Sequence, residues 1–361
     1  METLIIHRLP LDASDVAALA AMLRGRDVFT PSFITTAGAD VYNPLTYAQQ
    51  RVTSGTETVL VADRNIFSRW LALLNGTVAG PEHRVVAAVM AFAQCAGVMI
   101  EPNIALYEVA ATAGSNAANE ELRQFRIADN LEPSYWAEVA LGRASRLSFT
   151  QQGDTLSVKP IDFETPLHRW RRNYVITLKI AELALRGGRA ESQMAELLRW
   201  MYEDFLIGGP AVILAAHYLA PNSDRRGLLK NLWSSDRDRA VLGVRNAAWD
   251  MTLLSDWVVR VQKQERRNEL ALLCSLDRKV LEFARLLTDE PVEEPTTVSP
   301  ISMIFESLWG TAAGRRLSTL AEHYLADAGN PARQLHRPEE VGYYVGQLIL
   351  EGEAFIHRWK R

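Results

Sequence analysis

The chain has 361 residues, enough for about two domains of roughly 150 residues each. Hydrophobic residues make up 48% and charged residues 23% of the chain, which is typical of globular proteins and excludes a disordered one. Its two cysteines exclude a disulfide framework and a cysteine-rich zinc module. The net charge of −4 excludes a protein that is basic throughout, but not a local basic patch that contacts nucleic acid.

The sequence predicts neither a signal peptide nor a membrane segment. Its start carries Glu2 where a signal peptide has basic residues, and it lacks an apolar h-region. The longest apolar stretch, 85–100, is shorter than the roughly 20 residues that span a bilayer. Because this stretch is rich in alanine, it predicts a buried helix that runs into a strand. We therefore expect a cytoplasmic protein.

The predicted elements are mostly helices, with short apolar strands between some of them. In chain order, the helices before residue 145 are expected at 12–25, 66–74, 83–96, 103–111, 118–129 and 133–146. Later helices are expected at 166–187, 190–206, 211–219, 236–267 with a break near Asn246, 278–287, 301–327 and 338–359. Strands are expected at 57–62, 98–100 and 270–275, and a hairpin at 146–161. This alternation predicts an α/β fold with a small parallel sheet surrounded by helices.

The order of these elements predicts one interrupted core instead of two domains side by side. Residues 1–56 form a strand and helix lead-in, and 57–287 form the α/β core. A large helical insertion, at about 115–240, interrupts that core. Residues 288–300 contain three prolines and four acidic residues, which predicts a linker. The remaining residues, 301–361, form a C-terminal helical appendage.

Acidic residues follow the expected strands at the edge where open parallel sheets bind their ligands. Asp63 ends the first strand, Glu108 lies on the helix after the second, and Asp277 follows the third. Asp250 lies where a helix is expected to restart. Carboxylates that converge repel one another unless a cation lies between them, and hard oxygen ligands suit Mg²⁺ or Mn²⁺. The pattern predicts a metal site that activates water against a phosphodiester.

Each acid also has a simpler interpretation. A single aspartate after a strand is commonly the N-cap of the next helix, and Asp277 could serve only to cap 278–287. Glu108 lies in a mostly apolar helix, where an uncompensated carboxylate is rarely buried, although it could be half exposed. The functional interpretation therefore depends on several acids sharing one setting.

Three segments, together with Glu108 in the middle of a helix that follows a short strand, resemble the motifs of PIN-domain nucleases. They read Val-Leu-Val-Ala-Asp-Arg-Asn at 59–65, Ala-Ala-Trp-Asp-Met-Thr-Leu at 247–253, and Leu-Leu-Cys-Ser-Leu-Asp-Arg-Lys-Val-Leu-Glu-Phe-Ala at 272–284. The last is the most specific match, with an apolar strand, a small polar residue, an aspartate and a helix. The resemblance covers about 57–111 and 245–287. Asp250 lies much further beyond Glu108 than in compact members of the family, so the intervening helices would be an insertion.

The resemblance implies a PIN-like, metal-dependent endoribonuclease. In it Asp63, Glu108, Asp250 and Asp277 hold one or two Mg²⁺ or Mn²⁺ ions, with Asp256 as the alternative to Asp250. Water activated by the metal would attack the phosphodiester in line. The alternative function is a catalytically inactive PIN-like scaffold or partner-binding protein, because the insertion and the C-terminal helices supply surface for a homodimer or a regulatory partner.

Basic residues near the acids suggest a path for RNA, or for DNA. Three arginines surround Trp170, which could stack on a base while its neighbours contact phosphates. The expected nucleic-acid contacts are Arg64, Arg169, Arg171, Arg172, Arg245, Arg278 and Lys279. Acidic residues interrupt several of these basic stretches, so a solvated helix face is the alternative interpretation.

Overall fold

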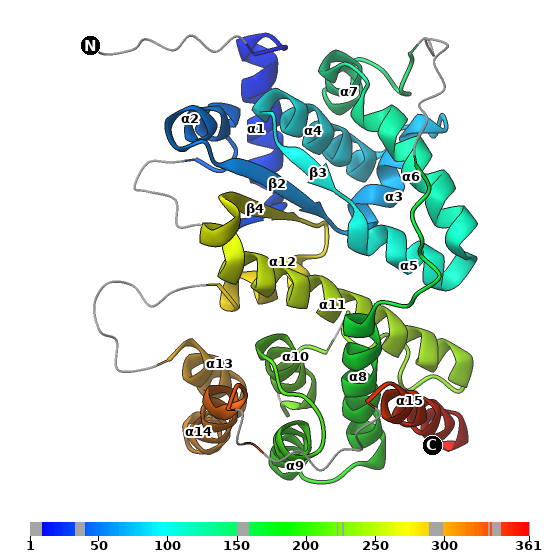
Figure 1. Ribbon diagram of the computed structural model, residues 1–361, viewed down its shortest axis with the longest axis vertical. Helices are drawn as coiled ribbons and strands as arrows, with labels where there is room; N and C mark the ends of the chain where they lie inside the picture. Colours follow the sequence, from blue (N-terminus) through cyan, green and yellow to red (C-terminus); the bar gives the residue numbers. More distant parts are fainter. Residues whose placement is uncertain are drawn as a thin grey trace. The chain divides into compact units, whose positions relative to one another are not determined.

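The computed structural model describes residues 9–32, 40–149, 159–288 apart from 222 and 226, 299–330, 333 and 341–360. Among these residues are fifteen helices and four strands (Figure 1). The chain divides into two compact units: Met1–Thr165 with Trp257–Ala284, and Pro166–Asp256 with Arg285–Arg361. Residues 150–158 of the expected hairpin at 146–161, and most of the expected linker at 288–300, lie outside the described residues, and the described ends of the hairpin are not in strands.

The first unit contains a four-stranded mixed sheet in the order β1-β4-β2-β3. Its strands are β1 (Phe29–Pro31), β2 (Glu57–Ala62), β3 (Met99–Glu101) and β4 (Glu269–Cys274). The three strands predicted from the sequence are confirmed, and β2 pairs in parallel with both β3 and β4. The prediction of a small parallel sheet holds for these three strands, but the whole sheet is mixed, because β1 pairs antiparallel with β4. With only three residues, one of them Pro31, β1 gives little sequence signal.

Helices surround this sheet, as the sequence predicts. Those of the first unit are α1 (Ala13–Arg26), α2 (Pro44–Ser54), α3 (Arg64–Leu74), α4 (Pro81–Ala96), α5 (Asn103–Ala113), α6 (Ser115–Asp129), α7 (Pro133–Ala140) and all but the last two residues of α12 (Arg278–Leu286). The alanine-rich stretch 85–100 forms the buried part of α4 and most of β3, as expected. No helix in the described part of the chain is long and apolar enough to cross a membrane.

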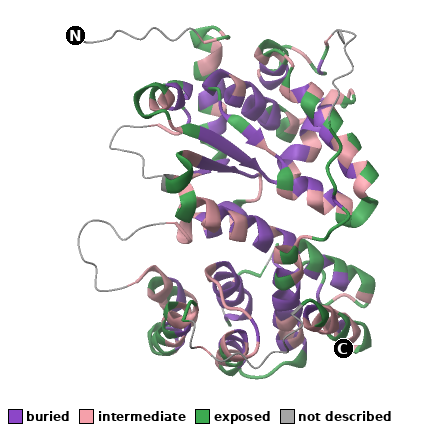
Figure 2. Cartoon of the chain, viewed as in Figure 1, coloured by how far each residue is buried: buried purple, intermediate pink, exposed green. Residues whose placement is uncertain are grey.

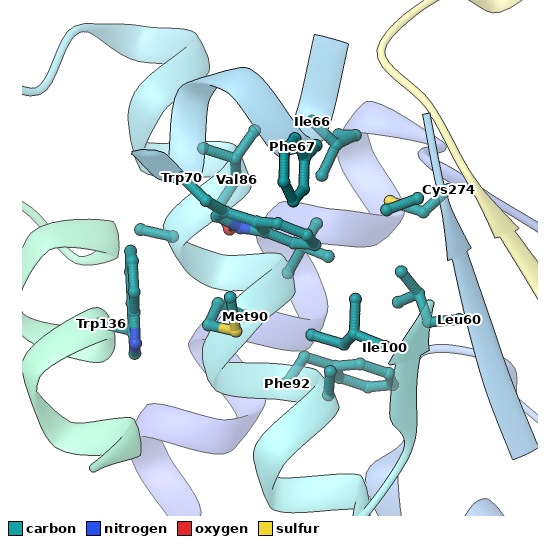
Figure 3. Close-up of a cluster of buried hydrophobic side chains, with 14 of the residues drawn as sticks. Leu60, Ile66, Phe67, Trp70, Val86, Met90, Phe92, Ile100, Trp136 and Cys274 are labelled. Atoms are coloured by element: carbon teal, nitrogen blue, oxygen red, sulfur yellow. Dashed lines mark hydrogen bonds between the residues drawn. The ribbon is translucent and has the colours of Figure 1, made fainter. Parts of the chain in front are cut away.

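The core of the first unit lies between the sheet and its helices (Figure 3). Leu60 and Cys274 come from neighbouring strands, while Trp70 and Phe92 come from α3 and α4. The fully buried Trp70 indole donates a hydrogen bond of 2.6 Å to the Val86 carbonyl, so its polar atom is satisfied inside the core. Figure 2 shows the strands as largely buried. Acidic residues at the ends of these strands therefore follow a backbone that is shielded from solvent.

The second unit is helical in the part that the structure describes. Its helices are α8 (His168–Arg186), α9 (Ala190–Glu203), α10 (Gly209–Leu219), α13 (Pro300–Trp309), α14 (Thr311–Asp327) and α15 (Val341–Arg358). The expected helix at 301–327 is two helices, because the chain turns at Gly310, where φ is 77°. The expected insertion, 115–240, contributes α6 and α7 to the first unit and α8 to α10 to the second.

Helix α11 (Arg237–Arg267) contributes residues to both units. The expected break near Asn246 is wrong, since the helix is continuous over its 31 residues. Its Gly243 allows a close approach of the chain, because a Cβ atom there would lie 1.6 Å from the Lys230 carbonyl oxygen. Asp250 is therefore an interior residue of a helix and does not begin one.

Candidate functional site

The candidate site lies at the carboxyl ends of β2 and β4. The register aligns Ala62 with Cys274, so the next residues, Asp63 and Ser275, follow at the same edge. The Asp63 amide donates to the Cys274 carbonyl at 3.0 Å, which extends the pairing by one residue. The Asp63 carbonyl accepts the first hydrogen bonds of α3. The sheet edge thus places Asp63 where the sequence predicts it.

A hydrogen-bond network fixes the Asp63 carboxylate. The Ser275 hydroxyl donates to Asp63 Oδ2 at 2.5 Å, and Asn65 Nδ2 donates to the same oxygen at 2.6 Å. Asn65 Nδ2 also lies 3.1 Å from Ser275 Oγ, and its Oδ1 accepts from the Leu276 amide at 3.1 Å. Asp63 and Ser275 are both buried. Asn65 therefore ties together the ends of two strands and orients the carboxylate between them.

Two further carboxylates act electrostatically on this position. Burial raises the pKa of Asp63 above its usual value, the hydrogen bond from Ser275 opposes that rise, and the charge of Asp277 adds to it. Burial and then the charge of Asp63 raise the pKa of Glu108 to about 7, while Arg64 opposes the shift. Asp63 therefore interacts electrostatically with both Asp277 and Glu108, and we call the three residues the sheet-edge carboxylates.

Asp277 also begins α12, as the simpler interpretation predicts. Its Oδ1 accepts a hydrogen bond from the Lys279 amide at 2.9 Å, and its carbonyl accepts from the Leu281 amide at 3.2 Å. The Asp277 amide in turn donates to Ser275 Oγ at 2.9 Å. The residue is thus a helix cap and a neighbour of Asp63 at once, and the two roles do not exclude each other.

The other two acidic candidates belong to the second unit. Asp250 and Asp256 both lie on the part of α11 assigned to that unit, and Asp256 accepts a hydrogen bond of 2.7 Å from Arg169. The first unit thus contains three of the four predicted metal ligands. Across the described ranges, no three His, Cys, Asp or Glu side chains are grouped so that they could hold a metal ion.

Several of the predicted nucleic-acid contacts have partners within the chain. Arg64 forms a bidentate ion pair with Glu121, with N–O distances of 2.6 and 3.1 Å. Arg245 pairs with Glu353 at 2.6 Å, and Lys279 pairs with Glu282 at 3.0 Å.

The remaining predicted contacts lie in different settings. Arg172 and Arg278 are exposed. Arg171 is half-buried, and its guanidinium would lie 3.3 Å from a Cβ atom at Gly346. The predicted stacking residue, Trp170, has its ring parallel to two neighbours, with centroids 5.0 Å from Tyr174 and 5.1 Å from Trp249. Base stacking on Trp170 would therefore compete with packing inside the second unit.

Three residues of the site were not singled out from the sequence: Asn65, Ser275 and Glu121. Asn65 and Ser275 follow the same two strands as the predicted acids, so polar residues just beyond buried strands were the available signal. Glu121 carried no such signal. Its pairing with Arg64 joins α3 to α6 across 57 positions of the chain, and only the packing of the helices brings them together.

Comparison with known proteins finds no match for the chain. No family model, no curated protein and no solved structure matches the chain. The resemblance to PIN-domain nucleases therefore rests on the motifs quoted from the sequence. The fold itself is a small mixed sheet within a largely helical chain.

Proposed function

We propose that the protein is a metal-dependent phosphodiesterase that acts on RNA, with DNA as the second candidate substrate. The observation that carries this proposal is the position of Asp63 at the carboxyl ends of β2 and β4, where it interacts electrostatically with Asp277 and with Glu108 of α5. Burial is the main cause of the raised pKa values of Asp63 and Glu108, and the negative charges of Asp277 and of Asp63, respectively, add to the shifts. Such an edge favours a bound divalent cation.

The donor atoms suit Mg²⁺ or Mn²⁺, since all three side chains supply hard oxygens. Because no three acidic, histidine or cysteine side chains are grouped as ligands in the described residues, the proposed ion is held by fewer carboxylates. Mg²⁺ commonly binds through one or two carboxylates and keeps several waters or takes substrate phosphate oxygens. Asp63 is the central ligand of this arrangement, since it is coupled to both Asp277 and Glu108.

The side chains have distinct parts in the proposed reaction. Ser275 and Asn65 hold Asp63 in one orientation, which limits the reorganisation needed to bind an ion. Glu108, with a pKa of about 7, can accept or release a proton near neutral pH, as a general base or acid does. A bound divalent cation supplies a Lewis acid that lowers the pKa of water and offsets the charge of the phosphodiester.

The test is cleavage of RNA by the purified protein in the presence of Mg²⁺ or Mn²⁺. We expect Asp63→Asn and Asp277→Asn to lose cleavage while remaining folded. Asp129→Asn is the matched control, because Asp129 is a half-buried aspartate of the same unit whose pKa burial also raises. Cleavage that is equal in the wild type and in both site variants would contradict the proposal.

A second function, a catalytically inactive scaffold, is favoured by different observations. Asp277 caps α12 and Asp63 accepts hydrogen bonds from Ser275 and Asn65, so both have structural roles without any metal. On α15, Tyr343 and Leu350 are each 66% exposed and lie two helical turns apart, which provides apolar surface for a partner. A scaffold would show no RNA cleavage and no increase in melting temperature with Mn²⁺.

A further inference from the structure

One cation lies at the border of the sheet-edge carboxylates. Arg64 follows Asp63 directly and is the first residue of α3. Its guanidinium lies over the Phe67 ring, 5.6 Å from the ring centroid, and its charge lowers the raised pKa of Glu108. Its two terminal nitrogens contact the two carboxylate oxygens of Glu121, at 2.6 and 3.1 Å. The strand end and the aromatic ring therefore fix where this guanidinium can act.

The Arg64–Glu121 pair remains accessible to solvent. The exposed fractions of the two side chains are 28% and 25%. Arg260 offers a contrast within the same unit, because its side chain is only 10% exposed and it pairs with Glu101 and Glu269. An arginine that is enclosed between two carboxylates, as Arg260 is, has a structural role. An ion pair that is accessible to solvent generally contributes little to stability, so another ligand can displace it.

The Glu121 carboxylate binds the Arg64 guanidinium in the bidentate geometry that a phosphate would also use. Two parallel N–H···O hydrogen bonds are the common mode of binding for both carboxylate and phosphate groups. We propose that Glu121 competes with nucleic acid for Arg64. When a strand binds, Arg64 releases the Glu121 carboxylate and binds a backbone phosphate of that strand in its place. The inference rests on the proposed function, and it identifies Arg64 as a phosphate-binding residue beside the sheet-edge carboxylates.

The exchange makes nucleic-acid binding selective. Without a ligand, Glu121 occupies the two terminal nitrogens of Arg64, so they are not available to an anion unless Glu121 is displaced. A small anion must displace the Glu121 carboxylate with no other contact to help it. A strand that also contacts the sheet-edge carboxylates gains enough binding free energy from its other contacts to displace Glu121. Removing Glu121 should therefore tighten binding, although it breaks an ion pair of the fold.

The experiment measures binding of a fluorescent single-stranded RNA of about 20 nucleotides by anisotropy. EDTA prevents cleavage, the salt concentration is about 50 mM, and DNA of the same sequence is measured in parallel. The variants are Glu121→Gln and, as matched control, Glu120→Gln. Glu120 is the preceding residue of α6 and pairs with Arg123 at 2.7 Å, so both variants lose one carboxylate and free one arginine.

We expect Glu121→Gln to bind about threefold to fivefold more tightly than Glu120→Gln, from the usual strength of a partly exposed ion pair. Glu121→Asp keeps the charge but shortens the side chain, so it should also bind more tightly than the wild type. It supplies the test if Glu121→Gln does not fold. Arg64→Gln should weaken binding and abolish the difference between Glu121→Gln and Glu120→Gln when combined with each.

Two results overturn the exchange. One is equal affinity of Glu121→Gln and Glu120→Gln, and the other is a gain that persists when Arg64 is replaced. Failure of the proposed function looks different, because the wild type would then neither bind nor cleave RNA or DNA. If the wild type cleaves RNA while Glu121→Gln binds no more tightly than its control, only the exchange is refuted.

Discussion

Replacing Glu108 by glutamine should make the protein more stable at neutral and higher pH. Burial and the charge of Asp63 raise the pKa of Glu108 from 4.5 to about 7, so its ionised form is disfavoured in the folded chain. Each unit of pKa corresponds to about 1.4 kcal/mol, which gives roughly 3 kcal/mol as an upper bound. Because Glu108 is only half-buried, solvent screening reduces this value, and we expect about 1–2 kcal/mol.

The sign of the effect follows from proton binding. Between the unfolded pKa of 4.5 and the folded pKa of about 7, the folded chain binds more protons than the unfolded chain. The favourable contribution of Glu108 is therefore complete below the lower value and is lost as the pH rises through the higher one. Glu108→Gln carries no titrating group at this position, so its stability should lack this decline.

The assay is urea unfolding of the wild type and Glu108→Gln at several values between about pH 4 and pH 8. The exposed Glu164 provides the control variant Glu164→Gln. We expect the advantage of Glu108→Gln over the wild type to grow as the pH rises and to level off above about pH 7. An advantage that is independent of pH, or a loss of stability at pH 8, would refute the reasoning.

Two further substitutions test local packing, one at the candidate site and one on α11. Ser275→Ala should destabilise the protein by about 1–3 kcal/mol, because the buried Asp63 loses its hydroxyl donor. Urea unfolding beside Ser255→Ala, a half-buried helical serine, measures this loss, and equal effects would argue against a special role for Ser275. Gly243→Ala should cost about 1–3 kcal/mol, since its Cβ would lie 1.6 Å from the Lys230 carbonyl oxygen. Gly25→Ala has open space on α1 and should stabilise by up to about 1 kcal/mol. Melting temperatures that fall equally in both glycine variants would contradict this distinction.

The central strands and their acids could be predicted from the sequence because local signals are strong there. An apolar run that ends in Asp63 specifies β2 and the edge of the sheet, and Cys274 and Ser275 mark the same edge for β4. A strand was expected within 1–56, but the place of β1 could not be predicted, because its three residues add to the sheet only through the pairing of Phe29–Pro31 with residues distant in sequence. Tertiary contact decides such short edge strands.

The absence of the expected break in α11 shows that burial outweighs local helix propensity there. Asn246 is a poor helix former, but Ala247 and Ala248 beside it are buried, and their packing maintains the helix. This continuity places Asp250 in the helix interior, and Asp250 belongs to the second unit. The Arg64–Glu121 pair was equally beyond prediction, because it depends on how α3 packs against α6.

Binding of Mn²⁺ to the sheet-edge carboxylates tests the central claim most directly. Calorimetric titration and the melting temperature would be measured for the wild type, Asp63→Asn and Asp129→Asn, in a buffer near pH 8 so that Glu108 is largely ionised. A ligand present at about 100 times its Kd stabilises the folded state by about 2.7 kcal/mol. We predict a saturable increase in melting temperature for the wild type and Asp129→Asn, and none for Asp63→Asn. Binding that is absent from the wild type, or unchanged in Asp63→Asn, would contradict the account.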